Sequence, residues 1–262
     1  MFSVIITTHN RDKLLKKAYK SVIKQSYKPN EIIIINNGSS KYFKKNFLIR
    51  KKVNLKIINN HKNLFQSRAR NLGAKISKNK YICFLDDDDI WEKNYLNHAR
   101  KLIISSKNEI ILSKIYTYKN KLKLFKDPKN FKLSDILIKN PGITGSNVIF
   151  NKKIFMSLGG YNSKLEPSED KSILVEAILK NKKIGFSDKK IIFSLHQGKR
   201  LTKNYHKLSN GVYNFFEKYK KYMNFSQKVF VLNRINIYRL KSFQLKFISN
   251  FIFFYLLNKI VN

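Results

Sequence analysis

Four consecutive aspartates, Asp86, Asp87, Asp88 and Asp89, follow the apolar segment 81–85. The chain has 16 acidic residues against 54 basic ones, so this short segment holds a quarter of its acids. Adjacent carboxylates repel one another, and a hard divalent cation such as Mg²⁺ or Mn²⁺ removes that repulsion and can bridge to a diphosphate. The segment therefore predicts a divalent-cation site, and a polar turn that closes a buried strand is the alternative.

A second pair of acids, Glu169 and Asp170, follows Pro167 and Ser168 at the start of an apolar pattern with helical spacing. The first turn of a helix favours an ionised carboxylate, because the positive end of the helix dipole lies there. An ionised carboxylate is the form that a general base requires. The pair therefore indicates a catalytic base, and the ordinary negative charge of a helix N-terminus is the alternative.

The elements that carry these acids alternate between strand and helix patterns. Uninterrupted apolar runs predict strands, and apolar residues at helical spacing predict helices between them. The strands are expected over 3–7, 31–35, 55–58 and 81–86, and the helices over 14–23 and 68–76. This alternation predicts an α/β fold with a single Rossmann-like, mixed but mainly parallel sheet flanked by helices.

Ligands of such sheets bind beyond the carboxyl ends of the strands. Three polar clusters lie at those ends, namely residues 7–11, 36–39 and 86–89, and we expect them to meet in one crevice. Shorter patterns over 109–112 and 146–150 predict further strands that extend the sheet.

The remaining chain is helical, basic and rich in aromatic residues. We expect a catalytic domain over residues 1–200 and a helical C-terminal extension over residues 201–262. The run 247–261 is interrupted by polar residues and is shorter than the ~20 apolar residues of a membrane span. A helix in the membrane interface is one interpretation, and packing on the catalytic domain or on a second subunit is the other.

The formal net charge of +38 calls for an anionic partner or a compositional explanation. Lysine, asparagine and isoleucine are all abundant, and no RNA-recognition, zinc-finger or helix-turn-helix pattern occurs, so nucleic acid is not the expected partner. An anionic membrane surface fits better, because each clustered Lys or Arg gains about 1 kcal/mol there.

The single cysteine, Cys83, excludes a disulfide framework and a cysteine-based metal site. No signal-peptide pattern begins the sequence. We therefore expect a cytoplasmic protein, with peripheral attachment to the inner face of the cytoplasmic membrane as a further option.

Six segments, in this order, resemble the motifs of family 2 glycosyltransferases with the GT-A fold: 3–11, 31–39, 69–73, 85–91, 159–161 and 169–170. The resemblance covers roughly residues 1–200. It implies inverting transfer of a sugar from a nucleotide-diphosphate donor to an acceptor hydroxyl, with Mn²⁺ or Mg²⁺ as cofactor. The implied acceptor is a saccharide or a lipid-linked saccharide, in the synthesis of surface polysaccharide, lipopolysaccharide or capsule.

The resemblance also implies roles for individual residues. Asp88 matches the metal ligand of the family's aspartate-any-aspartate motif, and Asp170 matches the catalytic base. His196 lies in a segment that resembles a late loop whose histidine meets the metal or the diphosphate, and a histidine satisfied within a loop is the alternative. The residues that would bind the nucleotide sugar are Thr7, His9, Arg11, Asn36, Asn37, Arg70, Asp86, Asp87 and Glu169.

Two positions depart from the family pattern. The family usually has an aspartate where this chain has Asn36, and that carboxylate often contacts the base of a uridine nucleotide, so the choice of base stays open. After Asp170 the family often continues with acidic, aliphatic and aromatic residues, whereas this chain has residues 171–174, Lys-Ser-Ile-Leu. Acceptor recognition is expected to differ accordingly. Trp91 is expected to pack behind the aspartate loop.

Other functions use some of the same features. A metal-dependent nucleotidyl or phosphoryl transferase also has strand-end aspartates, but it favours a phosphate loop such as GxxxxGK[ST], which the sequence lacks. A glycosidase needs two carboxylates on either side of one bond, a role that Asp88 and Asp170 would fill, and metal dependence separates it from a transferase. The charge alone would suit a non-enzymatic polyanion-binding protein. The sequence leaves the oligomeric state unknown.

Overall fold

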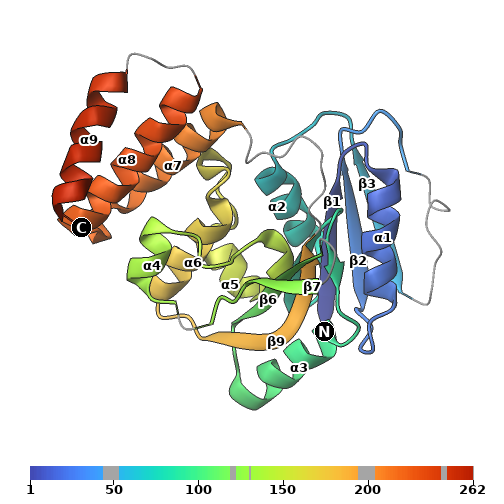
Figure 1. The fold of residues 1–262 in the computed structure, drawn as a ribbon. Helices are drawn as coiled ribbons and strands as arrows, with labels where there is room; N and C mark the ends of the chain where they lie inside the picture. Colours follow the sequence, from blue (N-terminus) through green and yellow to red (C-terminus); the bar gives the residue numbers. More distant parts are fainter. Residues whose placement is uncertain (44–52, 119–121, 130, 194–203, 243–246, 262) are drawn as a thin grey trace.

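The computed structural model describes residues 1–43, 53–118, 122–129, 131–193, 204–242 and 247–261. Figure 1 shows a curled central sheet with helices on both faces and the C-terminal helices at one side. The strands are β1 (Phe2–Thr8), β2 (Glu31–Asn37), β3 (Asn54–Asn60), β4 (Tyr81–Asp86), β5 (Ile90–Trp91), β6 (Ile110–Tyr118), β7 (Leu122–Lys126), β8 (Val148–Asn151) and β9 (Ile184–Phe193). The helices are α1 (Asp12–Ile23), α2 (Gln66–Ile76), α3 (Tyr95–Ser106), α4 (Leu133–Ile138), α5 (Lys152–Ser157), α6 (Glu169–Leu179), α7 (Tyr205–Tyr219), α8 (Phe225–Lys241) and α9 (Ile248–Val261).

The described strands form one sheet in the order β3-β2-β1-β4-β8-β6-β9-β5, with β7 paired to β6. Strands β1 to β4 are parallel, whereas β8 is antiparallel to both β4 and β6. Thr7 is in register with Ile35 of β2 and with Asp86 of β4, so the carboxyl ends of these strands meet at one edge. The predicted α/β fold and its mixed, mainly parallel sheet are confirmed.

The central strands read as continuous apolar runs because helices cover both of their faces. Ile5 of β1 packs in the same cluster as Ala69 of α2, whereas Ile6 packs in a second cluster with Leu15 of α1. Gly73 lets α2 approach the sheet closely, since a Cβ atom there would lie 2.4 Å from a methyl carbon of Ile5.

The predicted strands and helices of the first 86 residues are all present. The predicted strand at 109–112 continues to Tyr118, and the one at 146–150 begins with a 3-10 turn at Gly145–Asn147 before β8. Helix α3 and strand β9 were not predicted. Strand β9 lies between β6 and β5 and completes this side of the sheet.

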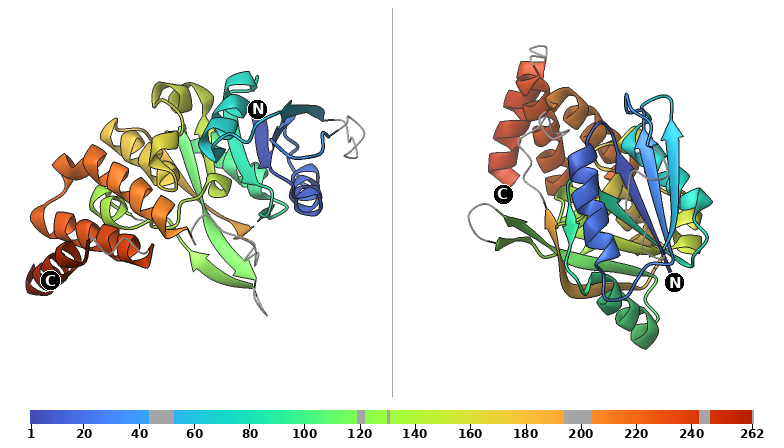
Figure 2. Two further views of the ribbon diagram at one scale, coloured as in Figure 1. Left: turned by 90° about the horizontal axis from the view of Figure 1, so that it is seen from above. Right: turned by 90° about the vertical axis from the view of Figure 1, so that its right-hand side faces the viewer.

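The C-terminal helices are attached through α7 and α8. Phe215 of α7 and Val231 of α8 belong to the same buried cluster as Ile5 of β1, so these two helices pack on the rest of the protein. The two interpretations of the run 247–261 concern α9 instead. Helix α9 packs on α8, and α9 and α1 lie at opposite ends of the molecule in Figures 1 and 2.

The division at residue 200 stays a prediction, because residues 194–203 lie outside the described residues. None of the helices in the described ranges is long and apolar enough to span a membrane.

Candidate functional site

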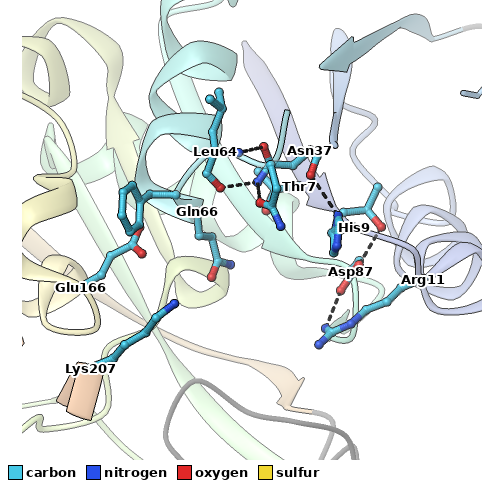
Figure 3. A pocket seen from close by; sticks show the side chains of 12 residues that line it. Thr7, His9, Arg11, Asn37, Leu64, Gln66, Asp87, Glu166 and Lys207 are labelled. Atoms are coloured by element: carbon cyan, nitrogen blue, oxygen red, sulfur yellow. Dashed lines mark hydrogen bonds and ion pairs between the residues drawn. The ribbon is translucent and has the colours of Figure 1, made fainter. Parts of the chain in front are cut away.

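A cavity of about 510 Å³ opens at the carboxyl ends of β1, β2 and β4, at the edge where the three polar clusters meet (Figure 3). Five of the residues expected to bind the nucleotide sugar line it: Thr7, His9, Arg11, Asn37 and Asp87. The opposite wall comes from Gln66 on α2, from Glu166 before α6 and from Lys207 on α7. Sequence reasoning did not select these last three residues.

The end of β1 is bonded to the aspartate loop. The hydroxyl of Thr8 donates a hydrogen bond of 2.7 Å to Asp87, and Nη1 of Arg11 lies 3.1 Å from a carboxylate oxygen of both Asp87 and Asp88. The ring nitrogen Nδ1 of His9 lies 3.0 Å from the backbone carbonyl oxygen of Asn37, which ties β1 to β2. One guanidinium therefore fixes two adjacent carboxylates, of which Asp87 lines the cavity and Asp88 is not among its lining residues.

The aspartates differ in exposure. The Asp88 side chain is 25% exposed and that of Asp87 only 6%. Burial raises the pKa of Asp87 to about 6, although the Thr8 hydrogen bond and Arg11 act in the opposite direction. The backbone N–H of Asp89 donates to the carbonyl of Asp86 at 3.1 Å, so this segment also forms the polar turn that was the alternative interpretation.

The acidic side chains near the cavity suit a metal site that is completed by a bound nucleotide better than one made by protein residues alone. No group of three or more His, Cys, Asp or Glu residues in the described ranges is placed to hold a metal by itself. Mg²⁺ is usually held by one or two carboxylates together with the phosphates of a nucleotide, and Asp88 with Asp87 offers two such carboxylates. The chemistry of the donors therefore fits a divalent cation brought together with a diphosphate. His196 lies outside the described residues.

The two asparagines at the end of β2 have different surroundings. Asn37 lines the cavity, and its amide bonds the backbone N–H and carbonyl of Leu64 at 2.9 and 2.8 Å. Asn36 is fully buried and is not among the cavity residues. Its Nδ2 donates to Asn59 at 2.8 Å and to the carbonyl of Lys41 at 2.9 Å. Asn36 thus holds the neighbouring loop in place.

Arg70 joins the aspartate loop to the start of α6. It is 2% exposed; its Nη2 lies 2.7 Å from Asp86, and its Nη1 lies 3.2 Å from Asp170 and 3.5 Å from Glu169. Gln66, one turn earlier on α2, donates a 2.8 Å hydrogen bond to the same oxygen of Asp86. Burial alone would lower the pKa of Arg70, but the carboxylates outweigh it and raise that pKa well above its ordinary value.

The two acids at the start of α6 titrate differently. Burial raises the pKa of Asp170 to about 6, with Arg70 acting against the shift. Burial and the neighbouring Asp170 raise the pKa of Glu169 well above its ordinary value, which favours its protonated form. The Asp170 side chain is 19% exposed and that of Glu169 only 7%. Asp170 is therefore the more accessible carboxylate, and it is mainly ionised at neutral pH.

The loop before β8 supports both sets of acids. The backbone of Gly145 hydrogen-bonds to Asp170, and a Cβ atom at Gly145 would lie 2.4 Å from Nη2 of Arg70. Ser146 accepts hydrogen bonds of 2.9 Å from the backbone N–H of Asp86 and from the indole N–H of Trp91. Trp91 lies behind the aspartate loop, as expected. Sequence reasoning predicted only a strand over 146–150 here and missed the contacts of Gly145 and Ser146.

Glu166 was also missed. Its carboxylate accepts hydrogen bonds from the backbone N–H of Ser67, at 2.7 Å, and from the Ser67 hydroxyl. It thereby caps the first turn of α2, the helix that carries Arg70. No local pattern signals such a contact between residues 99 positions apart.

Comparison with protein-family models matches residues 3–160 to the model described as "Glycosyl transferase family 2". An uncharacterized glycosyltransferase of Rickettsia bellii is 36% identical over 111 residues, which is 42% of this chain and 16% of that protein. WfgD of Escherichia coli, named a UDP-Glc:alpha-D-GlcNAc-diphosphoundecaprenol beta-1,3-glucosyltransferase, is 26% identical over 106 residues, 40% of this chain and 42% of that protein. The chain thus spans less than half the length of these curated relatives.

Two solved structures share the fold. TarS of S. aureus in complex with UDP-GlcNAc superposes with a TM-score of 0.64 at 17% identity, over 90% of this chain and 81% of that one. The mannosyltransferase PcManGT of Pyrobaculum calidifontis, in complex with GDP-Man and Mn²⁺, gives a TM-score of 0.62 at 15% identity, over 84% of this chain and 64% of that one. At these identities the likeness shows a common fold.

Proposed function

Because this chain belongs to glycosyl transferase family 2, we propose that it is an inverting glycosyltransferase that moves a sugar from a nucleotide-diphosphate donor to an acceptor hydroxyl. One observation carries the proposal: the buried guanidinium of Arg70 holds Asp86, beside the cavity, and Asp170, at the start of α6, within 3.2 Å of its nitrogens. This contact would position the proposed base relative to the proposed donor site. Family membership argues against the nucleotidyl-transferase and polyanion-binding alternatives.

The donor would bind in the cavity at the strand ends. Thr7, His9 and Asn37 offer hydrogen-bonding groups there, and the volume of about 510 Å³ suits a nucleotide. Arg11 and Lys207 supply positive charge on opposite walls, where a diphosphate would be stabilised. We assign the nucleoside to the Thr7 side, because ligands of such sheets lie against the carboxyl ends of the strands.

Asp170 would act as the general base. An acceptor hydroxyl is a poor nucleophile near neutral pH, so its proton must pass to a base while the oxygen attacks the sugar. The proton would move to the carboxylate of Asp170, the new C–O bond would form on the face opposite the departing diphosphate, and the anomeric configuration would invert. A pKa of about 6 leaves Asp170 ionised at neutral pH, while burial keeps it basic enough to accept the proton.

Asp88, assisted by Asp87, would hold Mn²⁺ or Mg²⁺ together with the diphosphate. When bound, such an ion neutralises the negative charge that develops on a departing nucleoside diphosphate. Arg11 orients both carboxylates through its contacts of 3.1 Å.

The proposed acceptor is a saccharide carried on a lipid, as a precursor of a surface polysaccharide. The printed name of WfgD gives that relative an acceptor linked to diphosphoundecaprenol. The net charge of +38 favours binding at an anionic membrane surface. We propose that the protein acts at the inner face of the cytoplasmic membrane.

The deciding experiment is calorimetric titration of the full chain with UDP, GDP and CDP, each with and without Mn²⁺. We expect one nucleotide to bind in a metal-dependent way, and Asp88→Ala to remove that dependence. Asp188→Ala, at an acid whose side chain is 76% exposed on β9, is the matched control. A folded protein that binds none of the three nucleotides would contradict the proposal. With a donor identified, NMR of the product shows whether the anomeric configuration inverts.

A further inference from the structure

Helix α9 exposes an unusual amount of apolar surface. Thirteen large apolar side chains in the described ranges are exposed, and nine of them lie between Tyr205 and Leu256. Five belong to α9 itself and are 42% to 60% exposed: Ile248, Ile252, Phe253, Tyr255 and Leu256. Isolated apolar residues on a surface are ordinary, whereas a contiguous group marks an interaction site.

Four of these five exposed apolar residues lie on one side of α9, and Phe253, at i+5 from Ile248, lies outside that side. Ile248, Ile252, Tyr255 and Leu256 follow the spacing i, i+4, i+7 and i+8, which places them in one stripe, and Lys259 continues it at i+11. We call these five residues the α9 stripe. A helix that is apolar on all sides is normally buried on all sides.

The other side of α9 is already covered. Phe251, Phe254 and Leu257 are half-buried on that side, and α9 contacts α8. In Figures 1 and 2 the helix forms the outer edge of the molecule, with α8 between it and the sheet. The α9 stripe therefore faces away from the protein core and lacks a covering layer in the described part of the chain.

The charges around the stripe are almost all positive. Residues 204–262 contain ten Lys and Arg residues and one acid, Glu217, which pairs with Lys220 at 2.8 Å. In the described part of the chain, no carboxylate lies within ion-pair distance of Arg239, Lys241 or Lys259.

These three cations instead lie over aromatic rings. The Arg239 guanidinium is 4.2 Å from the ring centroid of Phe247, Nζ of Lys241 is 5.4 Å from that of Tyr205, and Nζ of Lys259 is 5.1 Å from that of Tyr255. An ammonium or guanidinium beside an aromatic ring is well suited to the boundary between lipid headgroups and acyl chains.

We propose that the α9 stripe docks on an anionic lipid surface, with its apolar side chains among the headgroups and acyl-chain ends and Lys241 and Lys259 on lipid phosphates. A second copy of the chain is the less suitable cover, because the segment 204–262, with ten cations and one acid, would be repelled by the same segment of another copy. The inference rests on the proposed function for the kind of membrane, the one that carries the acceptor. Its physical basis lies in α9 and in the cations of α8, and does not depend on the nucleotide site.

The test is co-sedimentation of the full chain with vesicles of phosphatidylcholine alone or mixed with phosphatidylglycerol. We expect stronger partition into the anionic vesicles, weakened by salt. Ile252→Ser combined with Leu256→Ser should reduce partition at least about tenfold, since the double variant removes two apolar side chains that would be buried among the acyl-chain ends. Ile104→Ser, at an equally exposed residue of α3, should leave it unchanged.

Charge is tested separately. Lys259→Glu should lower partition into anionic vesicles about fivefold or more, because one lysine near such a surface contributes about 1 kcal/mol. Lys101→Glu, at an exposed lysine of α3, should not change it. Equal partition of the wild type and both α9 variants would overturn the inference. So would a dimer, seen by light scattering, that the apolar double variant dissociates.

Nucleotide titration of the same samples without vesicles separates this inference from the proposed function. Metal-dependent nucleotide binding without vesicle binding would overturn the docking surface and leave the proposed function in place. Vesicle binding that depends on the α9 stripe, without nucleotide binding, would support the docking surface and count against the proposed function.

Discussion

Nη1 of Arg70, which is almost fully buried, lies 3.2 Å from Oδ1 of the partly exposed Asp170. The same guanidinium lies 2.7 Å from Asp86, so one cation from α2 is shared by the end of β4 and the start of α6. A buried ion pair adds little net stability compared with apolar packing, but it fixes geometry, and removing one partner is costly. We therefore interpret Arg70 as a positioning residue, whereas the sequence resemblance had suggested direct contact with the nucleotide or diphosphate.

Replacing Arg70 by lysine should impair both folding and positioning. An ammonium on a flexible stem cannot span Asp86 and Asp170 as the planar guanidinium does. We expect the free energy of unfolding, measured in urea, to fall by about 1 to 3 kcal/mol, as for loss of charged hydrogen bonds in a buried site. Arg68→Lys, at an exposed arginine on the same helix, is the control. Equal losses in both variants would argue against the bridging role.

Activity should depend on the protonation of Asp170. Its pKa of about 6 lies above the ordinary aspartate value, so the ionised base is lost as the pH falls through 6, and kcat/KM should decline there with a slope of one. In Arg70→Lys this decline of kcat/KM should begin at a higher pH, because a less well placed cation stabilises the Asp170 carboxylate less and so raises its pKa. A change in stability alone would not move it.

Glu169, the neighbour of Asp170, provides a comparison that tests which of the two acids is the base. Asp170→Asn should lower kcat by about 10²- to 10⁴-fold, the usual contribution of a general base, with nucleotide binding retained. Glu169→Gln should have a much smaller effect, because the raised pKa of Glu169 already favours the neutral form that glutamine imitates. Steady-state rates of the two variants decide this, and the reverse order of effects would assign the base to Glu169.

The sequence predicted the parallel half of the sheet because those strands are buried on both faces. Strand β2, for example, is a run of isoleucines with no exposed residue. Strand β9 was missed because Asp188, Lys189 and Lys190 interrupt its apolar pattern, and its pairing with β6 shifts register at Ser113. A strand that is exposed in part, and irregular in register, lacks the alternation or the continuous run on which prediction depends.

In the candidate site, too, some positions follow from the sequence pattern of the strands and others depend on long-range packing. Residues at strand ends, such as Thr7 and Asp87, could be placed at the cavity because parallel strands end at one edge of the sheet. The contacts of Ser146 with Asp86, and the position of Lys207 across the cavity, depend on how distant segments pack. The burial of Asn36 could not be predicted from the sequence either, since its partner Asn59 belongs to another strand.

Removing the metal should abolish nucleotide binding without unfolding the protein. Asp87 and Asp88 already share Arg11, so the loop keeps a charge partner when the cation is gone. We expect a chelator to abolish nucleotide binding in titration, added Mn²⁺ to restore it, and circular dichroism to stay constant throughout. Loss of secondary structure in the chelator would instead indicate a structural metal elsewhere in the chain.

Restoring the family's usual aspartate at position 36 should destabilise this protein. The amide nitrogen of Asn36 donates to the carbonyl of Lys41 and to the side-chain oxygen of Asn59, at 2.9 and 2.8 Å in a fully buried position. A carboxylate in Asn36→Asp would place its oxygen against both acceptors, and we expect the free energy of unfolding to fall by about 1 to 3 kcal/mol at neutral pH.

The loss should be smaller at acid pH, because the protonated aspartic acid can donate one of the two hydrogen bonds. Asn97→Asp on α3, at a half-buried position, serves as the control for the change of amide to acid. Urea unfolding of both variants at two pH values measures the difference. An Asn36→Asp protein as stable as the wild type, with a new preference for uridine nucleotides, would show that this side chain turns toward the ligand when the donor binds.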